Sequence, residues 1–291
     1  MIIDMSHKVE LITDAKCIVG EGPLWDGENQ SLYMVDIHGK RLRKIQWDSF
    51  QITDMILPQQ TGFVVKGDDG ALYAGAEDGI YRIDHNGGFS LFSKPIFLKG
   101  ERFNDGKVGA DGRLYAGTYS RDYSAAFYRM EYDGTLIELF DKVGNSNGLD
   151  WSPDGKILYY NDTPTKRTDC FRFCEGELQD RTCMITYSCG NPDGMTVDTD
   201  GNIWTALWGE GSVVCVNPKS GAVIDKITLP VSQPSSCAFA GSDRKTLVIT
   251  TAAHGVSLRD EPLAGSLFAV RMDVPGLETN LLKVGRRGDI L

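Results

Sequence analysis

The sequence predicts an all-β protein, a six-bladed β-propeller with four antiparallel strands in each blade. A turn containing Gly, Asp or Asn is followed six times by an apolar run such as Leu-Tyr, and the copies start about 42 to 46 residues apart, the length of one propeller blade. Short runs rich in Val, Ile, Tyr and Phe also alternate with turn residues about every 8 to 12 residues. The six copies occupy residues 26–36, 69–75, 111–117, 154–160, 200–204 and 242–248.

The run that follows each repeat by one hairpin is expected to be the next strand of the same blade, because its alternation is typical of antiparallel strands. Near the N-terminus, residues 8–12 are expected to form a strand that completes the last blade. No amphipathic helix of about 12 residues is expected. Since no linker or shift in composition interrupts the pattern, residues 1–291 are expected to form a single domain. Clear examples of the following strand are residues 80–83, 126–130, 213–216 and 266–270.

Composition and charge exclude several classes of protein. The hydrophobic content of 41% and charged content of 24% are typical of soluble globular proteins, whereas the net charge of −10 argues against nucleic-acid binding. No run approaches the roughly 18 apolar residues of a membrane span, and residues 1–5 do not resemble a signal peptide. The seven cysteines include no C-x-x-C pair, which favours reduced thiols and a cytoplasmic location. No obligate protein partner is implied.

A short polar or glycine-rich loop is expected just before each repeat, leading into an apolar strand. If that strand is the innermost of its blade, all six loops lie on one face around the axis. Four of them carry an oxygen-bearing side chain, namely Glu21, Asn104, Asn147 and Asp193. These side chains are therefore expected to meet near one point. The six loops are residues 20–23, 60–63, 102–106, 145–148, 191–194 and 233–236.

Such a set of oxygens favours a divalent cation. Carboxylate and amide oxygens bind Ca²⁺, Mg²⁺ or Mn²⁺, and carboxylates also bind Zn²⁺. Two facing carboxylates would repel each other without a cation, and three protein ligands would leave positions for water and substrate. The alternative is that each residue only forms a turn, since Asn, Asp and Gly are common turn residues.

Several segments resemble the SMP-30/gluconolactonase/regucalcin-like family of six-bladed propellers. The most specific is RFNDGKV at residues 102–108, and the resemblance covers nearly the whole chain. It implies hydrolysis of a sugar lactone, an aldonolactone, with the help of one divalent cation. The identity of the cation is left open among Ca²⁺, Zn²⁺, Mn²⁺, Mg²⁺ and Fe²⁺. Further segments that carry the resemblance are residues 20–25, 111–113, 116–118, 146–149, 152–155, 192–195, 200–201 and 265–268.

The resemblance also implies roles for individual residues. Glu21, Asn147 and Asp193 correspond to the metal ligands of the family, and Asp193 is also expected to be the general base that activates water. The cation is expected to polarise the lactone carbonyl. The alternatives are a metal-dependent esterase or phosphotriesterase, and a non-catalytic calcium-binding or interaction propeller.

Three further residues are expected to bind the substrate. By the same resemblance, Arg102 and Asn104 bind its hydroxyl groups or ring oxygen, and the alternative for Arg102 is a structural ion pair with a neighbouring acid. Asp122 falls where the family often has a glutamate, although its loop departs from the family pattern. Tyr119 and Trp208 are candidates to stack on a sugar face at the mouth of the channel.

Other motifs in the sequence give weaker support for a function. Residues 144–148 match G-x-S-x-G, but that motif requires a following helix and the sequence predicts a strand there. Residues 198–202 resemble the start of a calcium loop, yet Gly209 stands where a glutamate ligand is required. The four histidines are far apart in the sequence, and each is expected to be a surface or packing residue. The role of His254 is left open, because it lies in a last-blade loop that faces the expected site.

Overall fold

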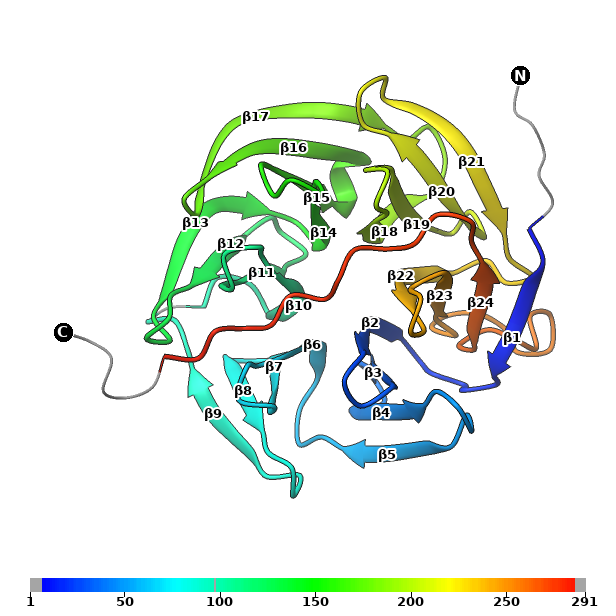
Figure 1. The fold of residues 1–291 in the computed structure, drawn as a ribbon, viewed down its shortest axis with the longest axis horizontal. Coiled ribbons are helices and arrows are strands. Elements are labelled where there is room, and N and C mark those ends of the chain that lie inside the picture. The colour runs from blue at the N-terminus through cyan, green and yellow to red at the C-terminus, as the bar shows by residue number, and fades with distance from the viewer. Residues whose placement is uncertain (1–6, 97, 286–291) are drawn as a thin grey trace.

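The computed structural model describes residues 7–96 and 98–285 and confirms the propeller. Six four-stranded antiparallel sheets surround a central axis (Figure 1). Within these residues the helical structure is one short 3-10 helix, Thr163–Thr165, and no helix is long and apolar enough to cross a membrane. Residues 1–5, on which the expectation about a signal peptide rests, lie outside the described part of the chain.

The first five blades run outward from the axis in chain order. Blade 1 contains β2 (Gly20–Asp26), β3 (Ser31–Asp36), β4 (Arg41–Gln46) and β5 (Ile52–Ile56). Blade 2 contains β6 (Thr61–Lys66), β7 (Leu72–Ala76), β8 (Ile80–Ile83) and β9 (Phe89–Ser93). Blade 3 contains β10 (Arg102–Val108), β11 (Leu114–Tyr119), β12 (Ala125–Met130) and β13 (Leu136–Val143). Blade 4 contains β14 (Ser146–Trp151), β15 (Ile157–Asp162), β16 (Arg167–Cys174) and β17 (Glu177–Thr186). Blade 5 contains β18 (Asn191–Val197), β19 (Ile203–Trp208), β20 (Ser212–Asn217) and β21 (Ala222–Thr228).

The sixth blade closes the ring with strands from both ends of the chain. It contains β22 (Pro234–Ala240), β23 (Thr246–Thr251) and β24 (Leu267–Arg271), and its outermost strand is β1 (Val9–Thr13). β1 pairs antiparallel with β24, with Val9 opposite Val270. The strand expected near the N-terminus therefore completes the last blade as predicted. Backbone hydrogen bonds between the two ends of the chain hold the ring closed.

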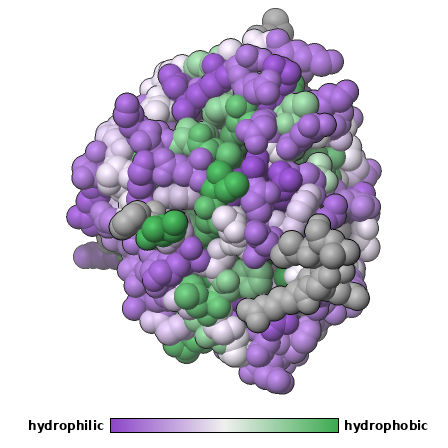
Figure 2. Space-filling model, turned by 90° about the vertical axis from the view of Figure 1, so that its left-hand side faces the viewer, coloured by the Kyte–Doolittle hydropathy of each residue, from purple (hydrophilic) through white to green (hydrophobic). Residues whose placement is uncertain are grey.

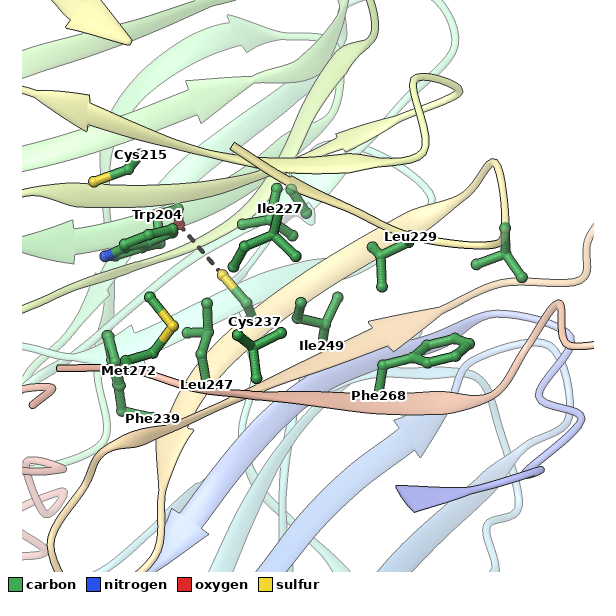
Figure 3. Packing of buried hydrophobic residues seen from close by; sticks show 14 of the residues in the cluster. Trp204, Cys215, Ile227, Leu229, Cys237, Phe239, Leu247, Ile249, Phe268 and Met272 are labelled. Atoms are coloured by element: carbon green, nitrogen blue, oxygen red, sulfur yellow. Dashed lines mark hydrogen bonds between the residues drawn. The ribbon is translucent and has the colours of Figure 1, made fainter. Parts of the chain in front are cut away.

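Apolar side chains fill the space between neighbouring blades. In the cluster between blades 5 and 6, Trp204, Ile227 and Phe239 are among the buried residues (Figure 3). Cys237 lies in the same cluster, where its Sγ donates a hydrogen bond of 3.3 Å to the backbone oxygen of Trp204. All seven cysteines are free thiols. On the side of the ring seen in Figure 2, hydrophilic residues predominate and hydrophobic residues lie in smaller groups between them.

Glycines let the innermost strands approach one another around the axis. A Cβ added to Gly62 would lie 2.2 Å from the backbone oxygen of Asn104, and one added to Gly148 would lie 2.4 Å from that of Asp193. Neither position has room for a larger residue, because ordinary contacts begin near 3.4 Å. The close approach of these strands brings the polar residues at their starts to one end of a narrow channel.

The C-terminal segment 273–285 crosses the other end of the channel (Figure 1, red). Its hydrogen bonds reach several blades: Leu282 N donates to Lys66 O at 2.8 Å, and Lys283 N donates to Gly112 O at 2.8 Å. The Thr279 hydroxyl donates to the backbone oxygen of Trp25 at 3.1 Å. Residues 277–280 help to line a cavity of about 270 Å³ in this half of the channel. The substrate entrance is therefore to be sought at the opposite end, where the inner strands begin.

Candidate functional site

Each predicted site residue on an inner strand lies at or beside a β-bulge. A bulge adds residues to one strand of a pair, bends it and re-aims its side chains. The prediction that these residues lie in loops is wrong, because each is the second or third residue of an inner strand. The residues are Glu21, Asn104, Asn147 and Asp193. The pairing register shifts between Glu21 and Leu24, Phe103 and Asp105, Ser146 and Leu149, and Pro192 and Met195.

These residues meet in one cavity of about 560 Å³. Glu21, Asn104, Asn147 and Asp193 are all buried, and Arg102 lines the same cavity. They come from β2, β10, β14 and β18, so four different blades contribute. The convergence predicted from the repeat is therefore present in the fold, and the cavity has the size usual for small-molecule sites.

Hydrogen bonds fix both amide side chains. The Asn104 Nδ2 donates to the backbone oxygen of Ser146 at 2.8 Å, while its Oδ1 accepts from Arg102 Nη1 at 2.6 Å. The Asn147 Nδ2 donates to the Thr163 hydroxyl at 2.9 Å. The Asn147 Oδ1 is left buried without a hydrogen-bond partner. An unpartnered buried oxygen is costly, so this atom is suited to bind a ligand.

Burial disfavours the ionised form of both carboxyl groups. Burial raises the pKa of Glu21 well above its ordinary value, and the nearby charges of Asp193 and Asp105 raise it further. Burial likewise raises the pKa of Asp193, and Asp105 adds to the shift. Ionising both carboxyl groups in this buried cavity is therefore unfavourable unless a positive charge compensates them.

The donor set fits a divalent cation of the hard, oxygen-binding kind. Among the described residues no three His, Cys, Asp or Glu side chains gather as a metal cluster. Two carboxylates, Glu21 and Asp193, are instead joined by the unpartnered amide oxygen of Asn147. Ca²⁺, Mg²⁺ and Mn²⁺ accept such mixed oxygen sets.

Arg102 is held in the cavity by neutral oxygen atoms rather than by an acidic side chain. Its Nη1 donates to Asn104 Oδ1 and, at 3.0 Å, to the backbone oxygen of Phe103. Its guanidinium lies 5.4 Å from the centre of the Tyr119 ring, a cation–π contact. Glu101 pairs with Arg121 at 3.8 Å. Among the described ion pairs, then, Arg102 has no acidic partner, contrary to the structural alternative considered from the sequence.

Asp122 is not brought together with the other predicted site residues. It accepts hydrogen bonds from the Ser120 hydroxyl and, at 3.1 Å, from the backbone N of Ser124. These hydrogen bonds lower the pKa of Asp122 to about 2. Asp122 is absent from the residues that line the cavity, and its role in substrate binding stays a prediction.

The structure adds residues that the sequence did not assign. Tyr119, Trp208 and His254 line the cavity, as considered from the sequence, but His38 lines it as well. The His38 and His254 rings are 5.0 Å apart and nearly perpendicular. His38 lies in the turn after the second strand of blade 1. This position was the available signal, because that turn lies at the same end of the blade as the start of the inner strand. The other lining residues that the sequence did not assign include Gln60, Glu77, Glu101, Arg121, Asn145, Thr163 and Asn191.

The chain is similar to known proteins over most of its length. The chain is 34% identical over 290 residues to a Bacillus subtilis protein that is named, provisionally, the sugar lactone lactonase YvrE, and the match covers 92% of this chain and 96% of that protein. It is 32% identical over 284 residues to the 6-deoxy-6-sulfogluconolactonase of Pseudomonas putida, with 94% and 97% of the two chains covered.

A solved structure and a family model complete the comparison. The calcium-binding protein regucalcin from Agrobacterium tumefaciens superposes with a TM-score of 0.90 at 25% identity, covering 96% of this chain and 98% of that one. Residues 19–253 match the model of the SMP-30/Gluconolactonase/LRE-like region, a span that includes every predicted site residue. The chain therefore belongs to the SMP-30/gluconolactonase/LRE-like family.

Proposed function

We propose that this protein is a divalent-metal-dependent lactonase that opens a sugar lactone to the aldonic acid. The observation that carries the proposal is the convergence of Glu21, Asp193 and the unpartnered Asn147 oxygen in one buried cavity. Two relatives that match nearly the whole chain carry lactonase names. These names support lactone hydrolysis as the reaction, whereas the metal and the residue roles rest on the geometry.

Glu21, Asn147 and Asp193 are proposed to hold the cation. When bound, a divalent cation would offset the two buried negative charges, keep Asp193 ionised and polarise the lactone carbonyl. The Asn147 amide is oriented for this role because its Nδ2 is bound to Thr163, whose hydroxyl in turn donates to the backbone oxygen of Pro192 at 2.9 Å. This contact ties the ligand on β14 to the strand that carries Asp193.

Asp193 is proposed to take a proton from the water that attacks the lactone carbonyl carbon. The acyl C–O bond of the ring then breaks, the ring oxygen takes up a proton and the aldonic acid leaves. Arg102 and Asn104 are proposed to orient the substrate through its hydroxyl groups or ring oxygen. The planar guanidinium suits paired oxygens, including those of the product carboxylate. The Tyr119 ring beside it provides an apolar wall.

A pH-indicator assay with D-gluconolactone tests the proposal. Purified protein is expected to release acid faster than the spontaneous reaction, to lose this activity with a chelator and to regain it with added cation. A phosphotriester measured in parallel separates the lactonase from a metal-dependent esterase. Cation binding by calorimetry without any hydrolysis would instead indicate a non-catalytic binding protein and would refute the proposed enzyme.

A further inference from the structure

A pair of histidines stands at the rim of the cavity. His38 follows β3 in blade 1 and His254 follows β23 in blade 6. Although the two residues are 216 positions apart in the sequence, their ring centres lie 5.0 Å apart. Both side chains line the cavity and both are exposed, whereas Glu21, Asn147 and Asp193 are buried below them. Neither imidazole is used in the chemistry proposed above. The pair therefore lies where the part of a substrate farthest from the reacting carbonyl would sit.

The surroundings of His38 favour its neutral imidazole. Burial lowers the pKa of His38, and the charges of His254 and Arg102 lower it further. A neutral imidazole offers one N–H donor and one acceptor nitrogen, which matches a hydroxyl group. Of the four described histidines, only His7 has its ring hydrogen-bonded, to Asp225 at 2.8 Å. The ring nitrogens of the rim pair thus remain available for a ligand.

The charges along the rim are mixed. Arg121 lines the cavity together with Glu101, with which it pairs at 3.8 Å, and Glu77 lines it as well. Since Glu101 is paired with Arg121 and Glu77 adds a further negative charge, the rim offers no surplus of positive charge to an anionic substituent such as a sulfonate or phosphate. An uncharged, hydroxylated end does not require such a surplus.

Building on the lactonase function proposed above, we propose that His38 and His254 bind the exocyclic hydroxyl groups of an uncharged aldonolactone. The pair then acts as a specificity determinant that selects hydroxylated lactones over unsubstituted ones. The proposed preference for an uncharged lactone distinguishes this chain from its Pseudomonas putida relative, whose name specifies a sulfonated lactone. It concerns substrate choice and leaves the residues that act on the carbonyl unchanged.

Kinetics with His38→Phe and His254→Phe test the inference. Phenylalanine keeps a ring for the edge-to-face contact but removes both nitrogens. The substrates are D-glucono-1,5-lactone, unsubstituted δ-valerolactone and 6-phosphogluconolactone. His85→Phe is the matched control, because His85 is exposed in the turn between β8 and β9 and does not line the cavity. His38→Asn, which keeps a donor and an acceptor, serves as the rescue variant.

Each Phe variant is expected to raise the KM for D-glucono-1,5-lactone about three- to tenfold, the effect of losing one hydrogen bond. The KM for δ-valerolactone and both kcat values should stay within about twofold, and His38→Asn should recover part of the loss. An equal rise in KM for both lactones, or no rise for either, would overturn the inference. So would a wild-type preference for 6-phosphogluconolactone that the Phe variants abolish. Failure of the wild type to hydrolyse any lactone would refute the proposed function itself, and the inference with it.

Discussion

The substitution Gly148→Ala is expected to damage stability and activity together. Gly148 lies on β14, one residue after the predicted ligand Asn147, and faces the next inner strand, β18. The new methyl group would lie 2.4 Å from the backbone oxygen of Asp193 and 2.6 Å from the backbone N of Met195. Both neighbours are backbone atoms, so no side chain can rotate away to make room.

The magnitude follows from the size of this overlap. Ordinary contacts begin near 3.4 Å, so β18 must move by about 1 Å near Asp193. Overpacking of this kind costs about 2 kcal/mol of unfolding free energy, which corresponds to a melting temperature about 3 °C lower for a chain of this size. A displacement of about 1 Å at a catalytic group costs roughly 100-fold in rate. Activity should therefore fall far more than the small loss of folded protein explains.

Differential scanning calorimetry and the lactonase assay measure the two effects on the same preparation. Gly27→Ala is the control, because the nearest atom to its added methyl group would be a side-chain atom, Trp25 Nε1, at 3.3 Å. The control is expected to resemble the wild type in both measurements. A Gly148→Ala protein with unchanged melting temperature and rate would refute the reasoning that glycines set the spacing of the inner strands and thereby the site.

Three further predictions concern the charges in the channel. Asp193→Asn is expected to lower kcat/KM by about 100- to 10,000-fold, measured at saturating cation, and a full rate with retained cation binding would exclude it as the base. Cation at 100 times its Kd is expected to add about 2.7 kcal/mol to the unfolding free energy, and an identical melting curve with chelator would contradict a bound metal. Burial raises the pKa of Asp105 to about 6, so the folded state holds this proton more tightly than the unfolded state does. In chelator, the unfolding free energy should therefore fall as the pH rises from about 4 to 6, and less so in Asp105→Asn; equal slopes for the two proteins would argue against the shift.

The blade repeat could be predicted because it depends on local chemistry. The Asp-Gly turns and the alternating runs after them specify hairpins by sequence pattern alone. When six repeats of equal length follow one another, a closed ring is the arrangement that packs every blade between two neighbours. A strand at residues 8–12 was predicted for the same reason, since the last blade otherwise lacks its outermost strand, and the structure forms it at Val9–Thr13.

The candidate site could be predicted in part from the same repeat. Equivalent positions in successive blades lie at the same height around the axis, so the sequence predicted that Glu21, Asn104, Asn147 and Asp193 converge. It did not predict the bulges that place these residues within strands, because a register shift depends on pairing with the neighbouring strand. Nor did it reveal that the Asn147 oxygen lacks a partner, which depends on where Thr163 lies.

The sequence by itself determined the number of blades, the order of the strands and the residue types available at one end of the channel. Only the tertiary structure decided which side chains from different blades touch. His38 and His254 meet because closing the ring brings the first and last blades side by side, and Asp122 stays apart because its own loop satisfies its hydrogen bonds. Contacts of this kind depend on the geometry of ring closure and on competition between local and distant partners, neither of which is encoded at any single position.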